Sequence, residues 1–352
     1  MQKKRFIDLA VHGGCSKKLG ANELQILLSG LTSAQSSTQK PSYSSWLDFG
    51  RFDLGEKVLV SNVDIILPMV LSASDFGEIA VAHVLSDIYT SGATPLFALN
   101  ILGIHKEMNS DKSEIIEMLD SASERLRAAN ISLVGGHTIS EQDDLYYGLA
   151  AVGIIDRDKL VTNDGAKKGD VLVLTKPLGT SVASINWKDN LEISDTFQDV
   201  LNGMKQLNEI ASKEMFNYGA TACTDITGFG FLGHTHNLLL ASKVSATISF
   251  GNLPIYESIK PFIEKTHVTR IWRKNFDYVE KYVNLKVDFS KTSFSPLLEI
   301  ILYDAQVSGG LLVCLPQSNA DNYVSKLRDN GINAAIIGEI TDDNPGYIDI
   351  TD

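Results

Sequence analysis

Short apolar runs alternate with amphipathic, helix-like stretches along both halves of the chain, and this alternation constrains the fold more than any other feature. Such alternation is typical of strands covered by helices in an α/β protein. A charged, turn-forming stretch from Asp156 to Asp170 separates the two halves. Because 352 residues exceed one ordinary compact domain, we expect an α/β (α+β) chain with two domains.

The pattern also predicts individual elements. A short helix at 21–28 precedes a serine-rich segment, 29–45, which lacks an apolar period and is expected to be a mobile loop. Capping boxes at Asp75 and Asp111 are expected to begin two helices. Expected strands lie at 49–54, 58–66, 131–136, 145–155, 171–175, 245–250, 311–315 and 332–340. Further expected helices lie at 192–216, 229–242 and 319–329.

Charge and composition exclude several classes of function. A net charge of −12 disfavours nucleic acid as a partner, because phosphate backbones are held by basic surfaces. The longest nearly uncharged apolar stretch, Tyr146 to Ile155, is too short to cross a bilayer. Three widely spaced cysteines fit neither a disulfide framework nor a zinc site, so we expect a cytoplasmic protein that does not act at a membrane.

Cys15 and Lys18 lie three residues apart in a glycine-bearing segment near the N-terminus. A cation beside a cysteine stabilises its thiolate, and lysine is also a good partner for phosphate. The pair is therefore a candidate catalytic site. An ordinary thiol beside surface lysines is the alternative that remains open.

Four aspartates, Asp48, Asp64, Asp87 and Asp225, each interrupt or border an apolar run. Unpaired carboxylates are rarely buried, because removing the ion from water is costly. Converging carboxylates are best stabilised by a hard cation such as Mg²⁺, which in turn binds polyphosphate. The alternative is that they are helix caps and surface residues.

A diglycine, Gly135-Gly136, ends the apolar strand before His137 and Thr138. Glycines allow backbone amides to approach a phosphate or a base closely, although a plain turn explains them equally well. Histidines give no metal-binding pattern: His234 and His236 would not share a helix face, whereas His83 and Asp87 would. For the histidines we favour polar surface or core positions over a metal site.

These segments together resemble the selenophosphate synthetase (selenide, water dikinase) family, in order and over nearly the whole chain. The strings most specific to that family are Lys176-Pro-Leu-Gly179, Thr224-Asp-Ile-Thr-Gly-Phe-Gly230 and Gln306-Val-Ser-Gly-Gly310. Other matching stretches are His12-Gly-Gly-Cys15, Ser61-Asn-Val-Asp64, Asp75-Phe-Gly77, Leu85-Ser-Asp87, Gly135-Gly-His137 and Asp304-Ala-Gln306.

The resemblance implies a two-domain fold of the aminoimidazole-ribotide-synthetase type, in which the N-terminal domains form a dimeric β-barrel. It divides the chain into an arm at 1–45, an ATP-binding, dimerising domain at 46–157 and a C-terminal domain at 158–352. The implied activity is the synthesis of selenophosphate from selenide, ATP and water by a homodimer, with release of AMP and phosphate.

Roles for individual residues also follow from the resemblance. Cys15 and Lys18 correspond to the catalytic residues. Magnesium ligands would be Asp48, Asp64, Asp87 and Asp225. Nucleotide contacts would come from Lys18, Asp64, Asp87, Gly135, Gly136 and His137.

The chain departs from the family pattern at several positions. Leu47 stands where the family usually has a second aspartate, and His83 stands where it usually has asparagine. Two alternatives therefore remain: another ATP-dependent enzyme of the same superfamily, or a nucleotide-binding homologue without activity.

Overall fold

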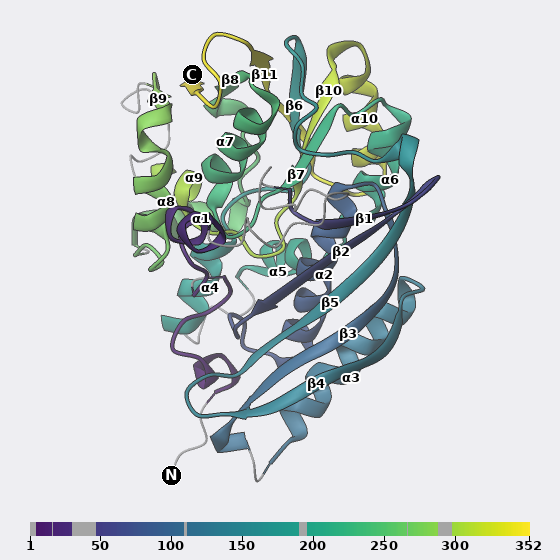
Figure 1. The fold of residues 1–352 in the computed structure, drawn as a ribbon. Helices are drawn as coiled ribbons and strands as arrows, with labels where there is room; N and C mark the ends of the chain where they lie inside the picture. The colour runs from purple at the N-terminus through teal and green to yellow at the C-terminus, as the bar shows by residue number, and fades with distance from the viewer. Residues whose placement is uncertain are drawn as a thin grey trace.

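Two β-sheets organise the computed structural model, which describes residues 5–15, 17–29, 47–108, 111–189, 196–265, 267–287 and 298–352. Within these residues one sheet has five strands and the other seven, and helices pack against both (Figure 1). One large core cluster contains buried side chains from both sheets. The α/β class with two domains is confirmed.

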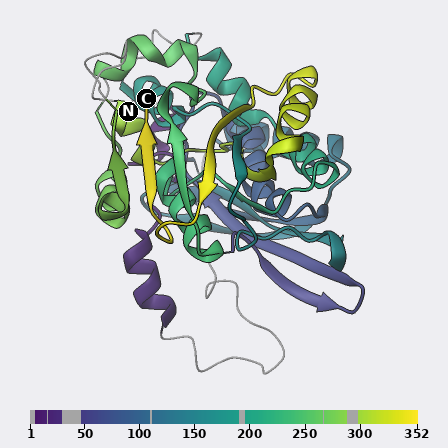
Figure 2. The same ribbon diagram turned by 90° about the horizontal axis from the view of Figure 1, so that it is seen from above.

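The five-stranded sheet comes from the first half of the chain. Its order is β1 (Gly50–Leu54), β2 (Lys57–Ile66), β5 (Tyr146–Asp156), β3 (Thr94–His105) and β4 (Ser132–Glu141). β1 and β2 form the expected hairpin, which extends away from the rest of the molecule in Figure 2. Helix α2 (Ala73–Thr90) packs on β2 and β5, and α3 (Ser113–Ala128) packs on α2. Helix α2 is therefore almost wholly buried.

The seven-stranded sheet comes from the second half. Its order is β7 (Ala222–Asp225), β10 (Leu311–Pro316), β6 (Asp170–Leu174), β11 (Ala335–Thr341), β8 (Ser245–Ser249), β12 (Ile348–Thr351) and β9 (Val283–Leu285). The other α-helices of the described residues are α1 (Ala21–Ser29), α4 (Thr180–Asp189), α5 (Gln198–Lys205), α6 (Glu209–Asn217), α7 (Gly230–Ser242), α8 (Trp272–Val279), α9 (Leu298–Tyr303) and α10 (Gln317–Asp329). None of the helices in the described ranges is long and apolar enough to cross a bilayer.

Two local expectations are wrong. The side chain of Ser72 accepts a hydrogen bond from the Asp75 amide at 3.2 Å, so Ser72 is the N-cap of α2, and Asp75 pairs instead with Lys205. The diglycine does not end its strand, because β4 continues to Glu141. A Cβ on Gly136 would lie 2.5 Å from the carbonyl oxygen of Asn100, so glycine is needed where β3 and β4 approach.

Several elements were not foreseen, including β3, β7, β12 and α4. β7 has only four residues, Ala-Cys-Thr-Asp, so neither its length nor its pattern predicts a strand. The serine-rich segment predicted to be mobile lies outside the described residues from 30 to 46.

The N-terminal arm contacts both halves of the chain. Gly14 forms an antiparallel bridge with Leu67, with N–O distances of 2.9 and 3.2 Å. Its φ of +58° favours glycine, and a Cβ there would lie 2.6 Å from a methyl group of Val307. The arm is thus held close to both halves of the chain, immediately before Cys15.

Candidate functional site

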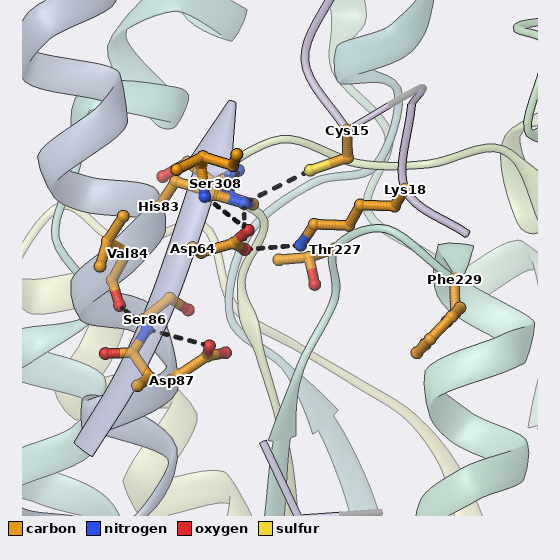
Figure 3. A network of polar contacts seen from close by, with 12 residues as sticks. Cys15, Lys18, Asp64, His83, Val84, Ser86, Asp87, Thr227, Phe229 and Ser308 are labelled. Carbon is orange, nitrogen blue, oxygen red and sulfur yellow. Dashed lines mark hydrogen bonds and ion pairs between the residues drawn. The ribbon is translucent and has the colours of Figure 1, made fainter. Parts of the chain in front are cut away.

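Asp64, on β2, is the centre of a buried polar network (Figure 3). Its Oδ2 accepts from Lys18 Nζ at 2.5 Å and lies 3.0 Å from His83 Nε2. Burial opposes charge on Asp64, but Lys18 and His83 hold the pKa of this carboxyl well below its usual range. Burial likewise opposes charge on Lys18, yet Asp64 raises its pKa above the ordinary lysine value. Asp64 and Lys18 therefore form a charged pair.

His83, on α2, connects this pair to Cys15. Its Nε2 lies 3.4 Å from the sulfur of Cys15, and its Nδ1 accepts from the Ser308 amide at 3.0 Å. Burial opposes charge on His83, whereas Cys15 and Asp64 raise its pKa to about 10. Because the backbone N–H of Ser308 donates to Nδ1, this nitrogen must present a lone pair and cannot carry a proton. The raised pKa favours a second proton on the ring, but the hydrogen bond from Ser308 requires an unprotonated Nδ1. We follow the hydrogen bond and assign a single proton to Nε2, where it faces both the sulfur and the carboxylate.

A cluster of acidic side chains lies beside Lys18. We call Asp48, Asp87 and Asp225 the acidic cluster. Burial and repulsion among the three raise the pKa of Asp48 and of Asp87 well above the ordinary value, and burial also raises that of Asp225. Among the described residues, neither carboxylate oxygen of Asp225 has a hydrogen-bond partner of ordinary geometry, although the nearby Ser86 hydroxyl lowers its pKa against the effect of burial.

The acidic cluster fits a divalent cation. Ligand atoms of Asp48, Asp225 and His234 all lie within 4.8 Å of one another. Partnerless carboxylate oxygens that repel one another are what a hard cation stabilises. Asp87 is held nearby, since its Oδ2 accepts from Asn62 Nδ2 at 3.1 Å.

Asp48, Asp87 and His234 line one cavity of about 420 Å³, which we call the acidic pocket, and Asp225 lies beside Asp48 and His234 without lining it among the described residues. Lys18, Asp48, Asp64 and Asp87 line it from the first half of the chain. Gly228, Phe229 and His234, from the start of α7, line it from the second. Its volume falls in the range of ordinary small-molecule sites.

Sequence analysis did not assign a site role to His83 or His234. His234 Nε2 accepts from the Phe229 amide at 3.3 Å and lies 3.2 Å from the Thr227 hydroxyl. Burial lowers the pKa of His234 to about 3, so the ring is neutral and has one lone pair, which Nε2 directs at the Phe229 amide. His234 could therefore bind a metal through Nε2 only in place of this hydrogen bond. For His83, the four-residue spacing to Asp87 was the available signal.

The structure does not bring Gly135, Gly136 and His137 to the acidic pocket. They lie on β4, the outer strand of the five-stranded sheet, and β5 and β3 separate β4 from β2. All three residues are exposed at this edge of the sheet. Within one chain, the predicted nucleotide contacts therefore fall into two separate groups.

Family models and known proteins match the chain along its length. A model described as AIR synthase related protein, N-terminal domain, matches residues 48–155, and the corresponding C-terminal domain model matches residues 167–350. The selenide, water dikinase of Citrifermentans bemidjiense is 34% identical over 339 residues, which cover 96% of each chain.

Solved structures agree on the fold. AaThiL complexed with AMPPCP and TMP superposes with a TM-score of 0.68 at 18% identity, over 95% of this chain and 94% of that one. Hydrogenase maturation protein HypE in complex with ATP gives a TM-score of 0.62 at 17% identity, over 99% and 95%. At these identities the likeness establishes the fold alone.

Proposed function

The chain belongs to the selenide, water dikinase family, and we propose that it synthesises selenophosphate from selenide, ATP and water, releasing AMP and phosphate. The observation that carries this proposal is the position of Cys15 and Lys18. Lys18 lines the acidic pocket. Cys15 precedes it by three residues, and the sulfur of Cys15 lies 3.4 Å from Nε2 of His83. A phosphate-binding cation and a nucleophilic thiol thus stand side by side.

ATP would bind in the acidic pocket with Mg²⁺. Asp48, Asp87 and Asp225 would hold the ion, with His234 as a further donor, and the bound ion would neutralise phosphate charge. Asp64 remains a predicted contact of the ion and the nucleotide. Since its Oδ2 is engaged by Lys18 and His83, we assign it first the task of holding Lys18 in place.

The chain's own residues then do three things. Lys18 directs its ammonium group at the transferring phosphoryl group and stabilises the negative charge that develops there. Cys15 positions the selenium nucleophile, with its sulfur held by His83. Little of Cys15 meets bulk water, because the residue is only 2% exposed.

We further propose a cytoplasmic homodimer. Strands of the five-stranded sheet leave large apolar side chains exposed, namely Phe52, Leu54, Val63, Ile65, Leu99, Leu133, Val134 and Ile139. Many exposed apolar side chains on one sheet are typical of a protein interface. Pairing two such sheets would form the expected barrel and give Gly135, Gly136 and His137 a route to the partner's nucleotide. The free cysteines fit a reducing compartment.

Phosphorus NMR of an anaerobic reaction with ATP, Mg²⁺ and selenide tests the activity. Selenophosphate, AMP and phosphate should appear in equal amounts. ADP with another phosphorylated acceptor, or nucleotide binding without turnover, would contradict the proposal. The Cys15→Ser variant should lose selenophosphate formation, whereas Lys168→Gln, which alters a surface pair with Asp342, should not.

A further inference from the structure

A second cavity lies on the other side of the arm and is lined by Cys15. It measures about 450 Å³ and is bounded by Gly13 and Gly14, by α4, and by the segment 267–270. Lys18 and the acidic cluster are not among its described lining residues. Conversely, Lys18 lines the acidic pocket and Cys15 does not. The two candidate catalytic side chains therefore face different cavities.

Positive charge predominates in this second cavity, which we call the basic pocket. Lys188 and Arg270 line it with His12 and His267, against the single carboxylate of Asp189. Such an excess of cations contrasts with the net charge of −12 on the whole chain. Asp189 is itself faced by His267, with 3.6 Å between Nδ1 and Oδ2.

The cations of the basic pocket are held in place. Lys188 Nζ donates to the carbonyl oxygens of Ala10 and Val11, each at 2.8 Å, and so attaches α4 to the arm. Arg270 Nη1 lies 3.5 Å from His12 Nε2. Burial lowers the pKa of His12 most, Arg270 and two lysines lower it further, and Asp144 acts in the opposite direction.

The rest of the lining suits a soft anion. Ile7, Met69, Ile185 and Val307 contribute apolar surface beside the sulfur of Cys15. The thioether of Met69 is polarisable and tolerates a large, weakly hydrated partner. A small monoanion would be drawn in by Lys188 and Arg270, whereas the acidic pocket would repel it.

We propose that the basic pocket is the entry and binding site of the chalcogen nucleophile, a small soft monoanion of the hydroselenide class. Building on the proposed function, this assignment separates the reactants by charge. The nucleotide occupies the acidic pocket and the anion the basic one. They meet at the turn that carries Cys15 and Lys18.

Steady-state kinetics of Arg270→Gln test the assignment. The KM for selenide should rise about tenfold, because a cleft lined by one sign of charge concentrates ions of the other sign. The KM for ATP and the kcat at saturating selenide should stay within twofold of wild type. Arg270→Lys should restore most of the selenide affinity, and Lys168→Gln is the matched control. An unchanged KM for selenide, or an equal rise in both KM values, would overturn the proposal.

A second measurement does not depend on catalysis. Cys15 is alkylated with iodoacetate or with iodoacetamide, and mass spectrometry follows the Cys15 peptide. Relative to a free small thiol, the folded protein should favour the anionic reagent by about tenfold, and Arg270→Gln should remove most of this preference. All three cysteines are buried, but Cys15 lines the basic pocket, whereas Cys223 and Cys314 line neither pocket, so their alkylation reports unfolding.

The two experiments separate the two proposals. If no selenophosphate forms in any reaction, the proposed function fails, and the alkylation ratio alone then decides the anion site. The measured quantity is the ratio of iodoacetate to iodoacetamide alkylation at Cys15. If this ratio equals that of the free thiol, or does not change in Arg270→Gln, the basic pocket is not an anion site, even in an active enzyme.

Discussion

The acidic and basic pockets differ in charge more than in size. Their volumes are about 420 and 450 Å³, and the arm contributes lining residues to both. In one, Asp48, Asp64 and Asp87 face a single lysine. In the other, Lys188 and Arg270 face a single aspartate. A short turn, from Cys15 to Lys18, thus lies between regions of opposite potential.

The opposite charges of the two pockets explain how one enzyme can bind two different anionic reactants. A polyphosphate needs a bridging cation, which carboxylates hold, whereas a small monoanion needs direct positive charge. If both shared one pocket, the carboxylates would repel the monoanion. Placing them on opposite sides of the arm removes that conflict.

Replacing Asp225 should abolish the acidic pocket's function. Asp225→Asn is expected to lower kcat by about a thousandfold, because the cation that neutralises phosphate charge loses a ligand. The KM for selenide should not change, since Asp225 lies beside Asp48 and His234 of the acidic pocket and does not line the basic pocket. Rates of AMP release at varied Mg²⁺ and selenide measure both quantities, and a raised selenide KM would contradict the separation.

Replacing Lys18 should reduce the rate while leaving both pockets intact. Lys18→Met is expected to lower kcat by about a hundredfold, the usual cost of one charge-stabilising donor. The matched variant Lys17→Met should change kcat less than threefold, because Lys17 pairs with Asp144 rather than with Asp64. Equal effects of the two substitutions would show that Lys18 acts only through general charge.

Replacing His83 should have a smaller effect. His83→Asn removes the contact to the Cys15 sulfur while keeping a polar side chain near Asp64, and should lower kcat about tenfold, the value of one hydrogen bond. His83→Leu should lower kcat further, because Lys18 is then the remaining partner of Asp64 Oδ2 and no polar group replaces His83. Parallel kcat measurements on the three proteins test this order.

The smallest expected effect is on the stability of the protein without divalent cations. The raised pKa values of Asp48, Asp87 and Asp225 mean that the folded chain binds more protons than the unfolded chain above the ordinary carboxyl value of 3.8. Stability in EDTA should therefore fall as pH rises above 3.8 through the raised pKa values of the folded chain. Thermal unfolding should show this slope, Mg²⁺ should reduce it, and Asp225→Asn should unfold about 2–4 °C higher than wild type in EDTA.

Much of the architecture and the candidate site was predictable from the sequence. The β1–β2 hairpin follows from two apolar runs around Gly55-Glu56, and α2 and α3 from their apolar periods. Asp64 was visible because a lone carboxylate interrupts the apolar run of β2. Such local signals survive folding, since they depend on backbone geometry and on the cost of burying charge.

Only the tertiary structure decided how distant side chains combine. No sequence spacing indicates that His83 joins Cys15 to Asp64, or that Lys188 and Arg270 share a cavity with Cys15. These contacts join segments tens to hundreds of residues apart, so chain packing alone determines them. The sequence by itself determined which residues could carry charge and chemistry. Folding determined which of them share a pocket, because electrostatic interactions depend on distance in space rather than along the chain.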